Sequence, residues 1–380
     1  MSSKKILVIG AGFAGAVHAR LLAEAGLSVD VIDKRAHIAG NAFDFIDTSG
    51  ISVHAYGPHL FHTNKPHVMQ WLQSFAEFIP YFHRVKADAG GTLVSLPINI
   101  DTLSCLFDVE LTSEEDARRY LSGLAVKVTN VSNAADYLYS RIGTRLTDLF
   151  FRPYTKKMWS LELEELDASV VKRIPIRYDK NDKYFPNDKH QALPRDGYTA
   201  LFRKILEHPL ISTTLNTSFS KEMEKEYRHT FASMPIDEYF DNCYGELPYR
   251  SIKFTSQLKD REPGKDWAVT NFTDNGIYTR ETQWDLIPGP HISIESKQTL
   301  FTKEIPCDYK ENNYERYYPV KVSDDRYKHL YSRYRDLSDA IPHITFIGRC
   351  GTYQYLDMDQ VIADSLTSAN KWLHQFAASS

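Results

Sequence analysis

Residues 4–35 read KKILVIGAGFAGAVHARLLAEAGLSVDVIDKR, and their pattern predicts a strand, a glycine turn, a helix and a second strand. The continuous apolar run Ile6–Ile9 is typical of a strand that is buried on both faces. Apolar residues recur at helical spacing from Ala16 to Ala25, and Gly26 ends this helix. The second strand, Ser28–Asp33, ends on an acid. The chain is therefore expected to open with a β-α-β unit of an α/β fold.

The turn between the first strand and the helix carries the spacing G-x-G-x-x-G at Gly10, Gly12 and Gly15. Glycines at these positions allow a tight turn, a close approach of the backbone to a pyrophosphate, and close helix–strand packing. Asp33 follows at about the distance expected of an acid that binds ribose hydroxyls. These residues predict a dinucleotide site, and both NAD and FAD fit them.

Two further features favour FAD over NAD. Arg35 and the turn Ala39-Gly40-Asn41 continue the opening as flavoproteins commonly do, although one glycine of the usual turn is missing. Near the C-terminus, a strand is predicted over Ile344–Ile347 and a helix from Met358 to about Phe376. Arg349 could pair with a pyrophosphate, and the helix N-terminus could face the electron-rich edge of a flavin. An ordinary strand–turn–helix is the alternative interpretation of this tail.

Composition excludes several classes of protein. The 380 residues are 42% hydrophobic and 25% charged with a net charge of −4, which argues against disorder and against a general polyanion binder. The four cysteines lie far apart without CxxC spacing, so neither a metal site nor a disulfide framework is expected. No signal peptide is visible, and no apolar stretch approaches the roughly 18 residues of a membrane span. We expect a cytoplasmic protein that binds neither nucleic acid nor a membrane.

The middle of the chain divides into a short β-rich stretch, a helical stretch and a long strand-rich stretch. Residues 81–99 predict two strands that are joined at Gly90-Gly91. Residues 101–150 are predicted to be helical, with Thr112 as a helix cap and Glu115 reaching back to it. The helices predicted there run over Ser113–Ser122 and Ala134–Phe150, and the strand-rich stretch 174–319 is predicted to contain one helix near Thr199–Glu207.

Several short stretches combine aromatic rings with histidines or arginines. Tyr56–His62 places two histidines beside a Gly-Pro turn. Tyr154 and Trp159 could stack on a nucleobase, or could pack the helical stretch against a sheet. Lys172–Arg177 is predicted to be extended and, together with Arg280, offers guanidiniums that could hold a diphosphate between them. The pattern therefore suggests a ligand that carries both a base and phosphates.

The number and the order of these stretches resemble the UDP-galactopyranose mutase family over most of the chain. The stretches that carry the resemblance are GAGFAG (10–15), YGPHLFHT (56–63), SLPIN (95–99), YTKKMW (154–159), KRIPIRY (172–178), LPRDGYTALF (193–202), PIDEYF (235–240), LPYRS (247–251), NFTDNGIYTR (271–280), YYPV (317–320) and GRCGTYQYLDMDQV (348–361). Any one of them is modest, whereas the ordered set is specific.

The resemblance implies an α/β fold in which a Rossmann-like FAD-binding domain carries an inserted helical subdomain and an antiparallel β-sheet subdomain. It also implies a homodimer. The expected limits are 1–75, 200–245 and 320–380 for the discontinuous FAD-binding domain, 100–165 for the helical subdomain, and 76–99, 166–199 and 246–319 for the sheet that binds substrate.

The resemblance also implies an activity. The family interconverts UDP-galactopyranose and UDP-galactofuranose with reduced FAD, although the net reaction is not a redox reaction. The flavin N5 attacks the anomeric carbon and displaces UDP, and the sugar ring opens to a flavin iminium before it recloses. The implied partners are the nucleotide sugar and NAD(P)H or another reductant that keeps the flavin reduced. The implied context is the biosynthesis of cell-surface polysaccharide.

Residue roles are carried over motif by motif. Arg173 and Arg280 are expected to bind the diphosphate, Tyr154 and Trp159 to flank the uridine, and His62 to lie near the flavin. The expected catalytic residues are Arg173, Arg280, Tyr355 and His62; the cofactor residues are Gly10, Gly12, Phe13, Gly15, Asp33, Lys34, Asn41, His59, Arg349, Asp357 and Met358; the substrate residues are His83, Phe151, Tyr154, Thr155, Trp159, Arg173, Tyr184, Asn271, Arg280, Tyr317 and Tyr355.

Three departures from the family pattern leave the substrate open. His83 stands where the family often has Asn, residues 281–285 read ETQWD in place of Glu-x-Lys-His, and Gln354 stands where a basic residue is common. Related substrates are therefore UDP-N-acetylgalactosamine, a dTDP-linked 6-deoxy sugar and a GDP-sugar. Two further alternatives are an FAD oxidoreductase of amine oxidase-like fold and a non-catalytic binder of nucleotide sugars.

Overall fold

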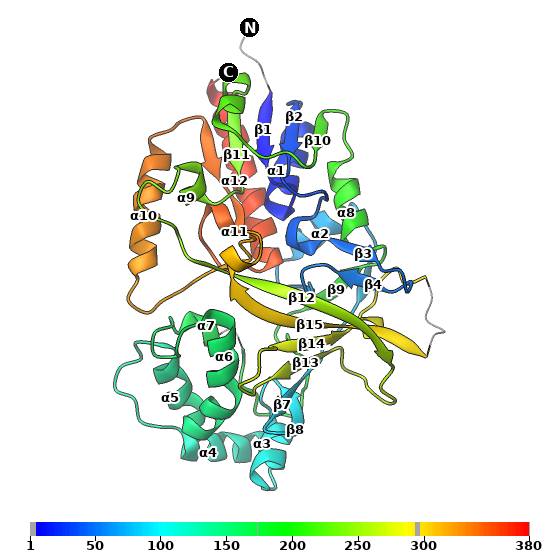
Figure 1. The fold of residues 1–380 in the computed structure, drawn as a ribbon, viewed down its shortest axis with the longest axis vertical. Helices are drawn as coiled ribbons and strands as arrows, with labels where there is room; N and C mark the ends of the chain where they lie inside the picture. Colours follow the sequence, from blue (N-terminus) through cyan, green and yellow to red (C-terminus); the bar gives the residue numbers. More distant parts are fainter. Residues whose placement is uncertain (1–4, 173, 293–296, 380) are drawn as a thin grey trace.

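The glycine turn lies at the carboxyl end of the first strand of a five-stranded parallel sheet. The computed structural model describes residues 5–172, 174–292 and 297–379. The order of the sheet is β10-β2-β1-β11-β17, and every neighbouring pair is parallel. These strands come from segments that lie far apart in the sequence (Figure 1). Their bounds are β1 Ile6–Ile9, β2 Val29–Ile32, β10 Ile211–Thr214, β11 His229–Ala232 and β17 Ile344–Phe346.

The apolar run of β1 is buried on both faces, as its sequence predicts. Ile6 and Val8 belong to the main core, whose helices α1 (Phe13–Glu24) and α12 (Met358–Ser379) lie side by side (Figure 1). Leu7 and Ile9 belong to a second cluster on the opposite face of the sheet. The alternation of side chains along a strand explains why all four residues must be apolar.

The second sheet has seven strands in the order β16-β12-β15-β14-β13-β7-β8, and its longest pair, β12 and β15, crosses the middle of the molecule (Figure 1). Its pairs are antiparallel except β7 and β13, which are parallel, so the sheet is mixed where the sequence predicts an antiparallel one. The bounds are β7 Val85–Ala89, β8 Thr92–Leu96, β12 Tyr249–Asp260, β13 Val269–Phe272, β14 Arg280–Gln283, β15 Gln298–Asp308 and β16 Tyr318–Pro319.

A group of helices covers the end of the molecule that lies away from the parallel sheet (Figure 1). The predicted cap at Thr112 is wrong by one residue, because Ser113 caps α4 and exchanges hydrogen bonds with Asp116. Glu115 does not take part in that capping box. The bounds of this group are α3 Ile100–Phe107, α4 Glu114–Leu124, α5 Ala134–Leu146, a π-helical turn Thr147–Phe151, α6 Arg152–Trp159 and α7 Ser169–Lys172.

The prediction that Lys172–Arg177 is extended is wrong at its start. Lys172 ends the short helix α7, and Arg173 lies outside the described residues. Arg177 belongs to a loop, where its backbone N–H donates to the Ile98 carbonyl at 2.8 Å and its side chain pairs with Asp179. A guanidinium paired in this way anchors the loop and is not offered to a diphosphate.

Smaller elements connect the two large sheets. A three-stranded sheet, β5-β9-β6, joins segments from near residue 62 and near residue 192. The subdomain limits expected from the family resemblance stay predictions. The remaining bounds are β3 Asp44–Ile46, β4 Ser52–His54, β5 Phe61–Thr63, α2 Pro66–Gln73, β6 Phe78–Pro80, β9 His190–Pro194, α8 Gly197–Leu206, α9 Ile236–Tyr239, α10 Arg326–Asp339 and α11 Gly348–Gly351.

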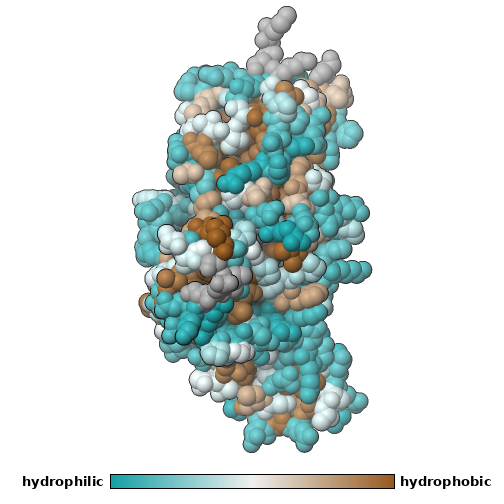
Figure 2. Space-filling model, turned by 90° about the vertical axis from the view of Figure 1, so that its right-hand side faces the viewer, coloured by the Kyte–Doolittle hydropathy of each residue, from teal (hydrophilic) through white to brown (hydrophobic). Residues whose placement is uncertain are grey.

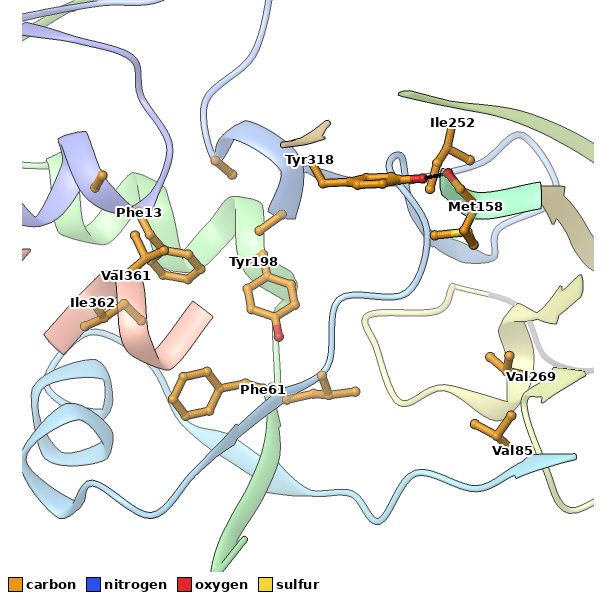
Figure 3. Packing of buried hydrophobic residues seen from close by; sticks show 14 of the residues in the cluster. Phe13, Phe61, Val85, Met158, Tyr198, Ile252, Val269, Tyr318, Val361 and Ile362 are labelled. Atoms are coloured by element: carbon orange, nitrogen blue, oxygen red, sulfur yellow. Dashed lines mark hydrogen bonds between the residues drawn. The ribbon is translucent and has the colours of Figure 1, made fainter. Parts of the chain in front are cut away.

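The hydrophobic core extends from the parallel sheet to the mixed sheet. Figure 3 shows Phe13 and Ile362 at one side of it and Val85 and Val269 at the other. On the face drawn in Figure 2, hydrophilic residues predominate and hydrophobic residues lie in separate groups. Among the described residues, no helix combines the length and the apolar composition needed to cross a membrane.

Candidate active site

One cavity of about 520 Å³ is lined by both the glycine turn and the mixed sheet. Of the residues predicted to form the site, Arg173 lies outside the described residues and Gly15 does not line the cavity. All the other predicted residues line it: Gly10, Gly12, Phe13, Asp33, Lys34, Asn41, His59, His62, His83, Phe151, Tyr154, Thr155, Trp159, Tyr184, Asn271, Arg280, Tyr317, Arg349, Tyr355, Asp357 and Met358. The fold thus brings together residues that are up to 348 positions apart, from Gly10 to Met358.

The glycine turn is closed too tightly for side chains. Gly10 has a φ of +99°, and a Cβ there would lie 2.1 Å from the Ser233 hydroxyl. A Cβ on Gly15 would lie 1.8 Å from the carbonyl oxygen of Gly10. Gly15 therefore lets α1 approach the turn from behind, which is the helix–strand packing role of the third glycine in this spacing.

Asp33 fixes the glycine turn from the end of β2. Its Oδ2 accepts a hydrogen bond from the Ala11 N–H at 2.8 Å, and its Oδ1 accepts one from the Arg35 N–H at 2.9 Å. A carboxylate has about four lone-pair positions, so both oxygens keep the capacity to accept from a ligand hydroxyl. Asp33 can therefore hold the turn and a ribose at the same time.

Arg35 is a residue of this site that the predicted set omits. Its guanidinium pairs with Glu315, donates to Asn41 Oδ1 at 2.9 Å, and lies 4.6 Å from the ring centre of Tyr56. Burial by itself would lower the pKa of Arg35, but the charge and hydrogen bond of Glu315, together with Tyr56 and Asp33, outweigh it and the pKa is raised. Arg35 could have been added from the sequence, because it is the basic residue that follows Asp33. No feature of the sequence marks its partner Glu315.

Arg349 faces the cavity from α11 near the second half of the predicted cofactor site. Its guanidinium lies 4.9 Å from the ring centre of Tyr355 and 5.9 Å from that of Tyr317. Its Nε is buried and has no hydrogen-bond partner among the described residues. A buried donor without a partner is costly, and an anionic or acceptor-rich ligand would satisfy it. Together with the glycine cradle and Asp33, this donor fits a bound dinucleotide.

Three polar side chains share one row of the mixed sheet. Asn271 of β13 is paired with Arg280 of β14, which is paired with Glu304 of β15, so all three point to the same face. Arg280 Nε lies 2.8 Å from Glu304 Oε2. A Cβ on Gly57 would lie 2.8 Å from Glu304 Oε1, so a glycine is required beside this carboxylate. Glu304 is absent from the predicted set, because an isolated acid in a strand is usually solvent-exposed.

The Arg280–Glu304 pair keeps a positive charge in a buried place. Burial lowers the pKa of Arg280, but the negative charge of Glu304 together with the neighbouring tyrosines raises it by more, and the guanidinium stays protonated. Burial raises the pKa of Glu304, and the charge of Arg280 counteracts part of that rise. Removing either partner would therefore leave a buried charge without compensation.

Helix α6 carries Tyr154, Thr155 and Trp159 and is fastened to the sheet at both sides. Lys157 Nζ donates to the carbonyls of Phe272 and Tyr278 at 2.9 and 2.7 Å. At the end of α6, the Met158 carbonyl accepts hydrogen bonds from Arg250 Nε at 3.1 Å and from the Tyr318 hydroxyl (Figure 3). These bonds join the helical group to β12, β13 and β16 and to the segment that leads into β14, the strand that carries Arg280. The residues that form these hydrogen bonds are Lys157, Met158, Arg250, Phe272, Tyr278 and Tyr318.

Two histidines of the cavity are held in their neutral form. Burial lowers the pKa of His59 to about 3, and burial, assisted by the charge of Arg280, lowers the pKa of His83 to about 3. The Tyr81 hydroxyl lies 3.1 Å from His83 Nδ1. Both imidazoles can therefore act as neutral hydrogen-bonding groups near pH 7.

Only one of the three departures from the family pattern lines the cavity. His83 does, whereas Gln354 is exposed and residues 281–285 do not contribute to the lining. Within that stretch, Glu281 pairs with Lys259 and Trp284 is buried with its Nε1 donating to Thr302. Of the three departures, only His83 is therefore placed to affect a ligand in the cavity directly.

The family model described as UDP-galactopyranose mutase matches residues 149–355, which is more than half of the chain. The chain belongs to the UDP-galactopyranose mutase family. A second model, described as an NAD(P)-binding Rossmann-like domain, matches residues 8–75 and covers the glycine turn. The fold class and the mutase family predicted from the sequence are thus confirmed, and the family consists of isomerases.

Two relatives match almost end to end. The chain is 36% identical to a probable UDP-galactopyranose mutase of Klebsiella pneumoniae, over 99% of this chain and 97% of the relative. It is 34% identical to the dTDP-fucopyranose mutase of Escherichia coli, over 97% of this chain and 98% of the relative. A crystal structure of reduced UDP-galactopyranose mutase aligns with a TM-score of 0.77 at 16% identity, covering 98% of this chain and 96% of that one, which shows the shared fold.

Among the described residues, no group of three or more His, Cys, Asp or Glu side chains is arranged to hold a metal ion. The side chains gathered in the cavity are instead donors and rings. Arginine and neutral histidine suit phosphates and hydroxyls, and the tyrosines of α6 and β16 suit a flat base or a sugar face. The arrangement can therefore bind a large ligand that carries charge, hydroxyls and an aromatic system.

Proposed function

We propose that the protein is a mutase that uses reduced FAD to interconvert the pyranose and furanose forms of a nucleotide-linked sugar, with UDP-galactopyranose as the first candidate substrate. The observation that carries this proposal is the shared cavity. The glycine turn and Asp33 line it together with Arg280, Tyr154 and Trp159. A cofactor and a nucleotide sugar could therefore meet in one enclosed space within a chain of the mutase family.

The residues of the turn and the tail would hold the cofactor. Gly10 and Gly12 would admit the pyrophosphate, Asp33 would accept from the adenosine ribose, and Arg349 would give its unpaired Nε to the cofactor. The start of α12 at Met358 would offer its free backbone N–H groups to the ring system. When it is bound and reduced, FAD supplies a nucleophilic nitrogen, so the sugar can be isomerised without net oxidation.

The residues of the sheet row and α6 would hold the substrate. Arg280 would bind the diphosphate, because Glu304 engages its Nε and a guanidinium has further N–H donors for phosphate oxygens. Charge stabilisation there favours departure of the nucleotide from the anomeric carbon. Tyr154 and Trp159 would flank the base, and the bonds of Lys157 keep their helix in register with Arg280.

The identity of the sugar is proposed on a narrower basis. The relatives named for UDP-galactopyranose and dTDP-fucopyranose are almost equally similar to this chain, at 36% and 34% identity. His83, the one departure in the cavity lining, is a neutral hydrogen-bonding group beside Arg280. We therefore retain UDP-N-acetylgalactosamine, a dTDP-linked 6-deoxy sugar and a GDP-sugar as alternative substrates. A homodimer, NAD(P)H or another reductant, and a cytoplasmic location belong to the same proposal.

An FAD oxidoreductase of amine oxidase-like fold remains the second candidate, since the cofactor half of the site would serve it equally well. A buried Arg280–Glu304 pair beside tyrosines serves no purpose in such an enzyme, because its substrates carry no diphosphate. A non-catalytic binder would keep both halves of the site. Membership of a mutase family favours isomerisation over both.

The test combines the cofactor and a substrate panel. The purified protein is denatured and the released cofactor is identified by chromatography and absorbance. The reduced protein is then incubated under anaerobic conditions with UDP-galactopyranose, UDP-N-acetylgalactosamine, dTDP-fucopyranose and a GDP-hexose, and furanose products are separated. The proposal expects FAD and one preferred sugar nucleotide. Oxygen consumption with an amine and no furanose product would favour the oxidoreductase, and FAD with neither activity would favour a binder.

A further inference from the structure

His62, at the centre of β5, is held by two contacts from one neighbouring loop. Its Nδ1 lies 2.5 Å from Asp188 Oδ2. Its ring stacks on Phe185, with ring centres 3.6 Å apart and planes at 14°. His62 also lines the cavity, whereas Asp188 does not. With one nitrogen bonded and one face covered, the Nε2 edge and the opposite face of the ring are the parts that can meet a ligand.

Asp188 is itself fixed by its surroundings. Asn64 Nδ2 donates to Asp188 Oδ1 at 2.6 Å, so each carboxylate oxygen has its own partner. Gln191 of β9, which is paired with His62 across the sheet, donates from Nε2 to the backbone carbonyls of Phe185 and Asp188 at 2.7 and 3.0 Å. The loop is therefore tied to the same sheet that carries His62, and the His62–Asp188 contact does not depend on a flexible side chain.

We propose that Asp188 is a positioning residue of the active site, which keeps the proton of neutral His62 on Nδ1 and presents Nε2 to the cavity as a hydrogen-bond acceptor. An ionised carboxylate can only accept, so its bond with Nδ1 requires Nδ1–H. In a neutral imidazole the other nitrogen then carries a lone pair. Nothing in the motifs of the sequence connects Asp188 with the cavity.

An acceptor at His62 Nε2 restricts which ligand groups can bond to it. Nε2 pairs with an N–H or O–H donor, and the donor could belong to the reduced cofactor or to a hydroxyl of the sugar. In either case the same tautomer is required, because an Nε2–H would meet the donor hydrogen head-on. The effect on turnover rests on the proposed function, whereas the tautomer of His62 does not.

Asp188→Asn is a sharp test because Asn64 dictates how the new amide is oriented. The Asn64 Nδ2 donor holds an oxygen at the Oδ1 position, so the amide NH₂ of the variant must face His62 Nδ1. Nδ1 then becomes the acceptor, and the proton moves to Nε2. The side chains are nearly the same size, so packing against Phe185 is retained.

The tautomer is measured by ¹⁵N NMR of histidine-labelled protein, in which the two nitrogen shifts of each ring distinguish Nδ1–H, Nε2–H and the doubly protonated form. His62 is assigned with a His62→Gln variant. We expect Nδ1–H in the wild type and in Asp188→Glu, and Nε2–H in Asp188→Asn. Turnover of Asp188→Asn is expected to fall roughly 10- to 100-fold with little change in KM, as for other residues that orient a functional histidine. Recording the spectrum with oxidised cofactor, reduced cofactor, and reduced cofactor plus UDP-galactose shows which addition shifts Nε2 and thus which molecule donates.

Asp182→Asn is the matched control. Asp182 lies on the same segment, pairs with Arg84 at 3.2 Å and does not line the cavity, so its variant should keep both the tautomer and turnover. An Nε2–H tautomer in the wild type would overturn the proposal even if Asp188→Asn failed to fold. An inverted tautomer in Asp188→Asn with undiminished turnover would overturn the positioning role. Absence of mutase activity in the wild type would instead count against the proposed function alone.

Discussion

Arg280 and Glu304 face each other across β14 and β15, with Arg280 Nε 2.8 Å from Glu304 Oε2. The side chain of Glu304 is only 2% exposed, while that of Arg280 is 27% exposed and reaches the cavity. The carboxylate thus lies behind the guanidinium and fixes it from the protein side. Any change of one partner alters both the stability of the fold and the charge offered to a ligand.

Arg280→Met should lose stability and turnover together, because it leaves Glu304 buried without its partner. Breaking such a pair costs about 3–5 kcal/mol, whereas the double variant Arg280→Met/Glu304→Gln should regain most of that loss. Turnover should stay down by roughly two to three orders of magnitude in both variants, because the charge at the diphosphate is missing. Denaturant unfolding and kcat/KM with UDP-galactose separate the two effects.

A control for these variants lies on the opposite face of the same sheet. Lys259 and Glu281 form an ion pair between β12 and β14 but do not line the cavity. Lys259→Met should leave kcat/KM unchanged. Recovery of turnover in the Arg280→Met/Glu304→Gln variant would show that Arg280 serves only the fold.

Lys157→Met should weaken substrate binding, although Lys157 does not line the cavity. Lys157 bonds the carbonyls of Phe272, at the end of β13, and Tyr278, just before β14, and thereby sets α6 against Arg280. Loss of charge-assisted bonds costs about 1.5–3 kcal/mol, so the KM for the sugar nucleotide should rise about tenfold or more. Steady-state kinetics give KM and kcat separately.

Lys156→Met provides the comparison, because Lys156 is on the same helix and makes an exposed ion pair with Glu162 at 2.6 Å. Exposed pairs of this kind contribute about 0–1 kcal/mol, so its KM should match that of the wild type. Equal KM values for the two lysine variants would exclude a positioning role for Lys157.

The part of the cavity around the glycine turn was predictable from the sequence because it is local. Gly10, Gly12 and Asp33 lie within one β-α-β unit, where spacing alone dictates a turn, a helix N-terminus and an acid at the next strand end. The tail at Arg349 could be added because strand and helix signals surround it. Even here the partner of Arg35 could not be foreseen, since Glu315 is 280 residues away.

The part of the cavity around Arg280 and His62 depends on strand register and on loop contacts, which one sequence does not display. Glu304 meets Arg280 only because β14 and β15 pair with that register. Asp188 meets His62 only because β9 pairs with β5. The extended prediction for Lys172–Arg177 failed because Lys172 belongs to a short helix and Arg177 is engaged by Asp179. Of the arginines that were predicted from neighbouring aromatic residues, Arg280 lines the cavity, whereas Arg177 is engaged by Asp179.

Gly15→Ala should abolish cofactor binding although Gly15 does not line the cavity. A methyl group there would lie 1.8 Å from the Gly10 carbonyl oxygen, so α1 or the turn must move. The ratio of bound FAD to protein, measured by absorbance, should drop towards zero. Gly123→Ala is the matched change, since a Cβ there meets nothing within 4 Å and α4 should gain helix propensity. Full FAD binding by Gly15→Ala would contradict the tight packing of the turn.

The buried side chain of His18 should make the stability of the fold depend on pH. This effect does not involve the cavity. Burial lowers its pKa from about 6.5 to about 4, although the bond to the Ala14 carbonyl opposes the shift. Between these values the unfolded chain binds the proton and the folded chain does not, so stability falls as the pH drops from about 6.5 towards 4. The loss between pH 8 and pH 5 is about 2 kcal/mol for this residue.

Urea unfolding at pH 8 and pH 5 tests this linkage. The difference in unfolding free energy should be about 2 kcal/mol smaller in His18→Gln than in the wild type. His67→Gln changes an exposed histidine and should leave the difference as it is. The same pH dependence in all three proteins would refute a buried neutral His18.

The most direct test of a cavity that joins cofactor and nucleotide sugar is isomerisation that depends on reduction. UDP-galactofuranose is incubated with the FAD-loaded protein under anaerobic conditions, once oxidised and once reduced with dithionite, and the products are separated by chromatography. The proposed mutase activity predicts UDP-galactopyranose only in the reduced sample, with no net consumption of dithionite. Equal conversion in both samples, or conversion that consumes reductant in proportion to product, would contradict it.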